Sequence, residues 1–198
     1  TKSGATKIWV PTFDEIYPSD PVIIASGAIG NLFEGVHRFG HFDGMLTVVK
    51  RLFDLVQPEF AVFGEKDFQQ LFLIKKMVKE MNLPIEIISA PTIRETSGLA
   101  MSSRNQRLSI TERKSAAGIS RALESAKSAS DLTTARLQLT KGLLSIPNFL
   151  LDYAEIIDGD SFEIADNSTE NCRAIVAGWI NGIRLIDNMA MSNLGDSK

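Results

Sequence analysis

The stretch Phe60-Ala61-Val62-Phe63-Gly64-Glu65-Lys66-Asp67 passes from a short apolar run into a glycine and three charged residues. The apolar run predicts a buried strand. Apolar residues at helical spacing then predict a helix over residues 67–82, and residues 85–88 predict the next strand. Strand, helix and strand form a βαβ unit, which implies a parallel sheet with a right-handed crossover. Ligands of such sheets collect outside the carboxyl ends of the strands, where Gly64 lies.

The segments upstream of this unit extend the α/β pattern toward the N-terminus. An apolar stripe that begins at Met45 predicts a helix, which Pro58 ends. Two β-rich runs, at residues 7–10 and 22–25, predict buried strands. We therefore expect an α/β domain with a parallel sheet over residues 1–92.

The segments downstream predict a smaller α+β domain over residues 93–198. Thr111 is expected to cap a helix that continues to about Ser128, and a second helix should cover residues 132–144. Asn181-Gly182 predicts a tight hairpin turn. Strands are expected on both sides of it and before it, at residues 153–157, 173–179 and 183–187. The tail at residues 194–198 is expected to be disordered.

Composition excludes several classes of function. A formal net charge of -3 gives no electrostatic reason to expect a nucleic-acid partner. Cys172 is the single cysteine, which excludes an internal disulfide framework and a multi-cysteine metal site. No apolar run approaches the roughly 20 residues that span a bilayer, and Thr1 to Thr6 does not read as a signal peptide. A cytoplasmic protein without a membrane partner is expected.

The turn after the first strand of the βαβ unit could bind a phosphate. Gly64 allows a ligand to approach the backbone closely, and the following helix presents its positive end to an anion. Lys66 adds a mobile charge, while Asp67 could cap the helix or accept a ribose hydroxyl. On spacing alone, an ordinary strand-turn-helix with a capping aspartate and a solvated lysine is the more frequent interpretation.

Two other polar groups could belong to the same site. Met101-Ser102-Ser103-Arg104 places two hydroxyls beside a guanidinium, a combination that suits a polyphosphate, although a polar interdomain linker would look similar. Gln70 lies three residues after Asp67, on the same side of the first helical turn. Its amide could bind a hydroxyl or carboxylate of a small substrate, or simply face solvent.

The remaining polar residues favour structural interpretations. No Cys, Asp or Glu stands at a zinc-ligand spacing from His37 and His41. A general-base role is chemically possible, but a loop-ordering or dimer-contact role is favoured because most histidines in proteins are not catalytic. Asp187-Asn188 is expected to form a turn at the end of a late strand. Cys172 is expected to be an inert buried thiol.

The order of the motifs along the chain resembles that of the pantothenate synthetase (pantoate–β-alanine ligase) family, from about Ile8 to Met191. The resemblance rests on five segments in this order: Glu15-Ile16-Tyr17-Pro18, His41-Phe42-Asp43-Gly44-Met45-Leu46-Thr47-Val48-Val49, Phe63-Gly64-Glu65-Lys66-Asp67-Phe68-Gln69-Gln70, Pro91-Thr92-Ile93-Arg94-Glu95 and Gly98-Leu99-Ala100-Met101-Ser102-Ser103-Arg104-Asn105. It implies a Rossmann-like fold of the nucleotidyltransferase type and a homodimer. It also implies an AMP-forming ligase that uses ATP, with Mg²⁺, to join pantoate and β-alanine through a pantoyl adenylate.

The resemblance also implies roles for individual residues. Lys66, Ser102 and Arg104 would be catalytic, because they would face the phosphates and stabilise the charge that develops as pyrophosphate leaves. Gln70 would bind a pantoate oxygen, and no residue is assigned to a metal. The implied ATP-binding set is Gly64, Glu65, Lys66, Asp67, Ile93, Met101, Ser102, Ser103 and Arg104.

One part of the family pattern does not occur in these 198 residues. The family's front segment, a strand followed by Pro-Thr-Met-Gly and then His-x-Gly-His, supplies its acid/base histidines, and it is absent from the sequence. We therefore expect the chain to be a fragment of a longer ligase, incomplete in its sheet and its site. The alternative is a truncated, non-catalytic piece that binds nucleotide or assembles with a partner. A different adenylyl-transfer enzyme of the same fold group fits Gln70 and Ser102-Ser103 less well.

Overall fold

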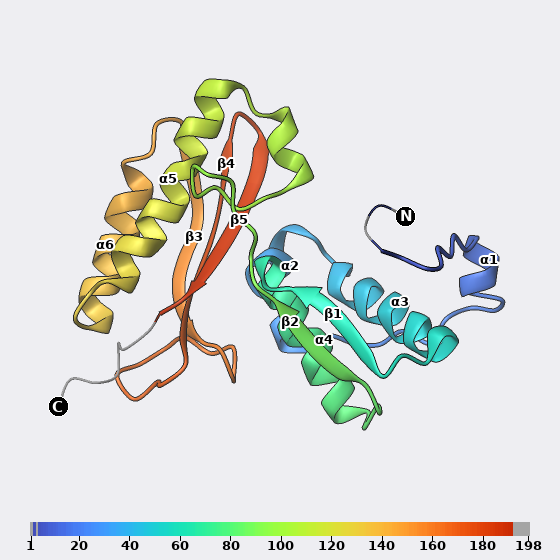
Figure 1. The fold of residues 1–198 in the computed structure, drawn as a ribbon. Coiled ribbons are helices and arrows are strands. Elements are labelled where there is room, and N and C mark those ends of the chain that lie inside the picture. Colours follow the sequence, from blue (N-terminus) through green and yellow to red (C-terminus); the bar gives the residue numbers. More distant parts are fainter. Residues whose placement is uncertain (1, 3, 192–198) are drawn as a thin grey trace. The chain divides into compact units, whose positions relative to one another are not determined.

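A computed structural model describes residue 2 and residues 4–191 of the chain, so the tail expected to be disordered lies outside the described residues. Internal contacts divide the chain into two units (Figure 1). Unit 1 comprises Thr1–Ala61 and Leu73–Glu86, and unit 2 comprises Val62–Phe72 and Ile87–Lys198. The chain therefore passes between the units within its central βαβ segment. The domain boundary expected near residue 92 stays a prediction.

The central βαβ segment is confirmed. Strand β1 (Phe60–Gly64) leads through the 3₁₀ turn η2 (Glu65–Asp67) into helix α4 (Phe68–Glu80), and β2 (Glu86–Ala90) follows. The two strands form a two-stranded parallel sheet with α4 as its crossover. Gly64 is thus the last residue of β1, at the carboxyl end that the sequence predicts.

Unit 1 is built around the long helix α3 (His41–Val56), in which Met45, Leu46, Val49 and Phe53 of the predicted apolar stripe are buried. The helix begins four residues before Met45, directly after Gly40 in the left-handed conformation (φ 69°). Shorter helices precede it: α1 (Phe13–Ile16), the 3₁₀ helix η1 (Ala28–Asn31) and α2 (Glu34–His37). The core of unit 1 includes Phe42, Leu46, Phe53, Leu73 and Ile74.

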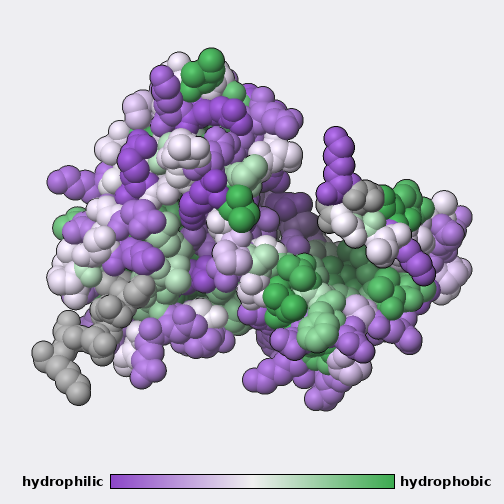
Figure 2. Space-filling view, in the orientation of Figure 1, coloured by the Kyte–Doolittle hydropathy of each residue, from purple (hydrophilic) through white to green (hydrophobic). Residues whose placement is uncertain are grey.

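The two upstream strand predictions are wrong. Residues 7–10 and 22–25 form no strand, and the side chains of Val10 and Val22 are 83% and 85% exposed. Around the second run, Ile24 instead donates its N–H to the hydroxyl of Thr47 on α3 (2.9 Å). A strand needs a neighbouring strand to satisfy its backbone groups, and among the described residues β1 pairs only with β2. Figure 2 shows hydrophobic surface over this N-terminal region.

Unit 2 contains an antiparallel sheet of order β3-β4-β5, formed by β3 (Phe149–Asp158), β4 (Cys172–Ile180) and β5 (Ile183–Ala190). All three strands were predicted, in shorter form. The hairpin at Asn181-Gly182 is confirmed. Both residues have positive φ (48° and 72°), which the right-handed twist of a two-residue hairpin requires.

Helices α5 (Ile110–Lys127) and α6 (Leu132–Leu144) cover one face of this sheet (Figure 1). Their buried side chains form a single core with the strands, which includes Leu123, Leu139, Leu143, Ile156 and Val176. The 3₁₀ turn η3 (Ser103–Arg107) directly precedes α5 in the chain. Among the described residues, no helix is long and apolar enough to span a bilayer.

The start of α5 corrects the predicted cap. The N-cap is Ser109 rather than Thr111: its hydroxyl accepts from Glu112 N, and the Glu112 carboxylate accepts from Ser109 N (2.7 Å). We expect Ser109→Ala to lower the free energy of unfolding by about 1 kcal/mol, because it leaves a helix N–H unsatisfied. Urea denaturation measures the change. The matched control is Thr111→Ala, which replaces an exposed residue two positions later. Equal losses in the two variants would contradict the cap.

Candidate functional site

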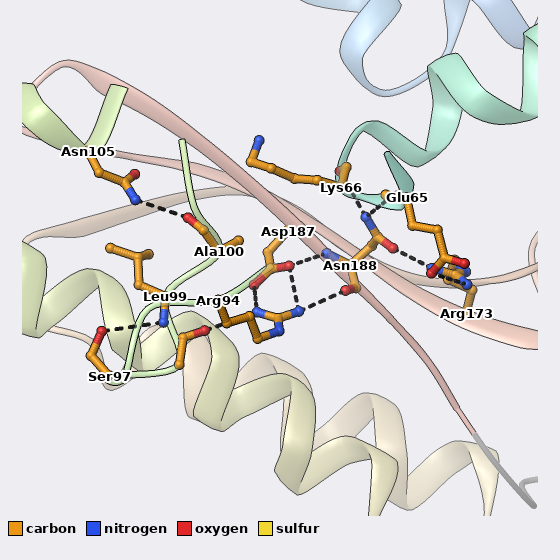
Figure 3. Close-up of polar contacts among 11 residues, drawn as sticks. Glu65, Lys66, Arg94, Ser97, Leu99, Ala100, Asn105, Arg173, Asp187 and Asn188 are labelled. Atoms are coloured by element: carbon orange, nitrogen blue, oxygen red, sulfur yellow. Dashed lines mark hydrogen bonds and ion pairs between the residues drawn. The ribbon is translucent and has the colours of Figure 1, made fainter. Parts of the chain in front are cut away.

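The Gly64-Glu65-Lys66-Asp67 turn is held by its backbone carbonyls. The side-chain amide of Asn188 on β5 donates to the carbonyl oxygens of Glu65 and Lys66, both at 2.9 Å (Figure 3). The side chain of Lys66 extends away from this anchor, whereas Asp67 is exposed. The contacts of the turn place it in unit 2, the unit that also contains the antiparallel sheet.

The carboxylate of Glu65 is engaged within the protein. It pairs with Arg173 on β4 (3.4 Å), and Arg173 also donates to the Asn188 amide oxygen (2.5 Å). The guanidinium lies 4.2 Å from the ring centroid of Phe68, a cation–π geometry. Burial lowers the pKa of Arg173, and the nearby Glu65 carboxylate opposes that shift. Glu65 therefore anchors the turn, and its predicted contact with ATP stays a prediction.

The segment before the Met101-Ser102-Ser103-Arg104 motif is a small hairpin. Met101 N donates to Ile93 O (2.9 Å), and Glu95 N donates to Leu99 O (2.8 Å). Gly98 turns the chain with φ 88°, a conformation that disfavours residues with a side chain. The hairpin brings Ile93 and Met101, both predicted to bind ATP, side by side with exposed side chains.

The motif itself forms an ordered turn. Ser102 caps η3, with its hydroxyl oxygen accepting from Arg104 N (3.3 Å). Beneath it, Asn105 is 2% exposed and donates to Ala100 O and to the Glu95 carboxylate, both at 3.0 Å. Buried polar groups that find partners in this way fix a loop in one conformation. The segment is therefore an ordered turn anchored by hydrogen bonds within unit 2.

Asp187 and Asn188 are the residues that the sequence interpretation misjudged most. They lie inside β5 rather than in a turn, and both are 4% exposed. Arg94 reaches the Asp187 carboxylate with both terminal nitrogens, at 2.7 and 3.0 Å (Figure 3). One signal was available, because Asp187 continues the period-two series of buried positions Ile183 and Leu185. An acidic residue in that phase indicates a buried partner.

A cleft in unit 2 brings together the three residues predicted as catalytic. Its lining comprises Lys66, Leu99, Ala100, Ser102, Arg104, Asn105, Ile119, Arg184, Leu185, Ile186 and Asp187. Lys66 comes from the η2 turn and Ser102 and Arg104 come from the η3 turn, so the turns after β1 and after the hairpin meet here. Two cations and a hydroxyl around one cleft suit a polyphosphate.

Arg184 is a cleft residue that the sequence did not identify. Its guanidinium donates to the Asp152 carboxylate (2.8 Å) and lies 4.5 Å from the centroid of the Trp179 ring. It follows the hairpin turn closely, at a position that carries no motif. The other predicted residues, Gly64, Glu65, Asp67, Gln70, Ile93, Met101 and Ser103, are not among the residues that line this cleft.

Neither the two histidines nor Cys172 are among the residues that line this cleft. His41 opens α3, where its ring lies 5.1 Å from that of Phe42. Cys172 is buried at the start of β4, as predicted, and burial raises the pKa of its thiol. Within residues 2 and 4–191, no group of three or more His, Cys, Asp or Glu side chains could hold a metal ion.

Comparison with known proteins gives a consistent result. The family model described as "Pantoate-beta-alanine ligase" matches residues 1–190. The pantothenate synthetase of Acidothermus cellulolyticus is 42% identical over 196 residues, which cover 95% of this chain and 65% of that protein. The pantothenate synthetase of Thermobifida fusca is 38% identical over 205 residues, covering 96% and 69%. The chain thus spans about two thirds of the length of these curated relatives.

Solved structures show the same similarity. A crystal structure of pantothenate synthetase from Thermus thermophilus matches with a TM-score of 0.89 and 37% identity, over 96% of this chain and 71% of that one. The pantoate-beta-alanine ligase from Francisella tularensis matches with a TM-score of 0.66 and 33% identity, over 90% and 62%. The Francisella protein was crystallised in complex with "Beta-gamma ATP" and β-alanine. The predicted fold class is confirmed.

Proposed function

This chain belongs to the pantoate-beta-alanine ligase family, and from that premise we propose that it carries the ATP-binding part of a pantothenate synthetase. In the proposed reaction, a pantoate carboxylate oxygen attacks the α-phosphorus of ATP, which forms pantoyl adenylate and releases pyrophosphate. The amine of β-alanine then attacks the acyl carbon, and AMP leaves as pantothenate forms. The observation that carries the proposal is the shared cleft of Lys66, Ser102 and Arg104.

The cleft residues suit the first of these two steps. Departure of pyrophosphate places negative charge on its bridging oxygen, and fixed cations stabilise such charge best where water is partly excluded. Lys66 and Arg104 would supply those cations. Ser102 uses its oxygen to accept from Arg104 N, so its hydroxyl hydrogen can be donated to a phosphate oxygen.

The remaining residues keep the roles that the family resemblance implies. Gly64 and Asp67 would lie near the ribose, Ile93 would present its backbone to adenine, and Gln70 would bind a pantoate oxygen. Gln70 is half-buried on the first turn of α4, three residues from Asp67, which suits two groups that face one bound molecule.

We propose that Mg²⁺ enters the site with ATP. The described residues offer no cluster of carboxylates or histidines to hold it alone, and Mg²⁺ commonly binds through substrate phosphates with few protein ligands. Its chemical contribution would be to neutralise phosphate charge.

A homodimer in the cytoplasm is the assembly and location that we propose. Family resemblance is the main support for both. Large apolar side chains on the surface of unit 1, such as Phe13, Val36 and Phe39, also favour a contact with another polypeptide, because exposed apolar patches tend to mark interaction sites. Sedimentation equilibrium of the purified chain tests the stoichiometry.

A second function is favoured by the sequence itself. The family's His-x-Gly-His segment does not occur in these 198 residues, so this polypeptide could bind nucleotide or assemble with a partner without catalysing the reaction. The two functions predict different behaviour of the same protein. Nucleotide binding is common to both, whereas AMP release distinguishes them.

The test measures AMP formed from ATP, pantoate and β-alanine by two proteins. One is the 198-residue chain. The other, called the extended form below, is this chain preceded by an N-terminal segment that carries the family's strand, Pro-Thr-Met-Gly and His-x-Gly-His pattern. We expect turnover by the extended form and none by the chain alone. Turnover by the chain alone would contradict the requirement for the histidine segment, and an inactive extended form would contradict the ligase.

A further inference from the structure

Two successive residues of β5 hold both of the turns that meet in the cleft. Asn188 binds the Glu65–Lys66 backbone, and Asp187 binds Arg94 in the hairpin that leads to Ser102. Neither residue lies in a motif that the family resemblance used. The hydrogen bonds of Asn188 indicate a specific structural role for its side chain.

All the hydrogen-bonding groups of the Asn188 side chain are engaged. Its two N–H groups donate to Glu65 O and Lys66 O at 2.9 Å, and its oxygen accepts from Arg173 (2.5 Å). Two carbonyls on one side and a guanidinium on the other leave only one sensible orientation of the amide. The main chain of Asn188 is fixed as well, because its N–H donates to Asp187 (2.8 Å) and its carbonyl accepts from Arg94 (3.3 Å).

Holding the two carbonyls also fixes the direction of two N–H groups. In a trans peptide the C=O and the next N–H point in opposite directions. Because the carbonyls of Glu65 and Lys66 face Asn188, the N–H groups of Lys66 and Asp67 face the other way. These lie at the start of a helical segment, where the geometry of the helix provides no internal acceptor for the first N–H groups. Such oriented donors bind anions.

We propose that Asn188 is a positioning residue for the phosphates of ATP. Its amide turns the Glu65–Lys66 peptides so that the N–H groups of Lys66 and Asp67, together with the Lys66 side chain, face the nucleotide. Arg173 supports it by neutralising Glu65, which would otherwise repel phosphate at the same turn. This inference rests on the proposed function, because it takes ATP as the ligand. It adds a residue that makes no contact with the nucleotide itself.

The test is Asn188→Asp, which keeps the shape of the side chain and replaces its two N–H donors by a carboxylate oxygen. That oxygen would face two carbonyl oxygens, so the turn would lose its anchor. We expect the Kd of the 198-residue chain for ATP to rise about tenfold, the usual effect of losing such hydrogen bonds. The Kd for adenosine, which lacks phosphates, should stay unchanged. Isothermal titration calorimetry measures both.

Asn171→Asp is the matched control. Asn171 also donates its amide to an oxygen, that of Asp160 (3.0 Å), on an exposed loop of unit 2. The Asn171→Asp substitution should change neither the Kd for ATP nor the Kd for adenosine. Nitrogen-15 relaxation of the amides of Glu65, Lys66 and Asp67 provides a readout that needs no ligand, and these should become more mobile in Asn188→Asp alone. If the aspartate variant does not fold, Asn188→Ser, which retains a single donor, replaces it.

The possible outcomes separate the two proposals. A wild-type chain that binds no ATP would contradict the proposed function, and the relaxation data would still decide whether Asn188 orders the turn. Equal loss of ATP and adenosine binding would overturn the positioning role in favour of a general structural one. Unchanged ATP binding and unchanged mobility of the turn would also overturn it.

Discussion

Lys66→Ala in the extended form is expected to slow adenylate formation by about 100-fold or more, the usual effect of removing one preorganised group that stabilises developing charge. Lys66 lines the cleft with Ser102 and Arg104, and its backbone is fixed by Asn188. The ammonium is thus carried on a segment of backbone that is already in place when pyrophosphate forms. The measurement is pantoate-dependent exchange of labelled pyrophosphate into ATP, which reports the first step alone.

Two further variants make this result specific. Lys75→Ala removes an exposed lysine from the wet face of α4 and should leave exchange unchanged. Lys66→Arg keeps the charge with a different shape and should recover part of the rate. Wild-type exchange by Lys66→Ala would contradict the phosphate role. A loss that is overcome completely by saturating ATP would indicate that Lys66 contributes to binding and not to the chemical step.

Asp187→Ala is expected to lower the free energy of unfolding of unit 2 by about 3 kcal/mol. The substitution leaves the Arg94 guanidinium, which is 22% exposed, without its carboxylate, which is 3% exposed. An uncompensated and largely buried charge of this kind is strongly destabilising, and the partial exposure of Arg94 places the effect at the lower end of the usual range. Urea denaturation followed by Trp179 fluorescence measures it. All the proteins compared also carry Trp9→Phe, which removes the tryptophan fluorescence of unit 1.

The matched control for this substitution is Asp160→Ala, an exposed aspartate in the same unit. It should change the stability by less than about 0.5 kcal/mol. Replacing both partners, in Arg94→Met with Asp187→Ala, should cost less than removing Asp187 alone, because no buried charge remains unpaired. A loss below about 1 kcal/mol in the single variant would show that water or other groups compensate Arg94.

The fold was predictable where local pattern and backbone pairing agree. Helical spacing predicted α3 and α4, and Asn181-Gly182 predicted the β4–β5 hairpin, because these signals act over a few residues. Residues 7–10 and 22–25 have the apolar composition of strands but form none. Composition reports only that a segment can be buried in a sheet, whereas a strand also requires a partner, which sequence periodicity does not specify.

The candidate site was likewise predictable only in part. Lys66, Ser102 and Arg104 stand in recognisable motifs, and the order of those motifs alone predicted that the three residues share a site. The residues that hold those motifs were missed because their contacts are distant in sequence: Arg94 and Asp187 are separated by 93 positions. Adjacent polar residues near a predicted strand end resemble a turn. Only the alternation of buried positions along β5 would have indicated otherwise.

The contact between Asn188 and the carbonyl of Glu65 has a consequence for biosynthesis, since it joins residues 123 positions apart. The ribosome makes the Glu65 turn early and β5 almost at the end of these 198 residues. Closing such a long loop is slow and depends on the sheet having assembled. A nascent chain therefore carries its lysine long before the surrounding peptides are oriented. We therefore expect the proposed nucleotide site to form late, when β5 docks, and the incomplete polypeptide to bind ATP weakly during translation.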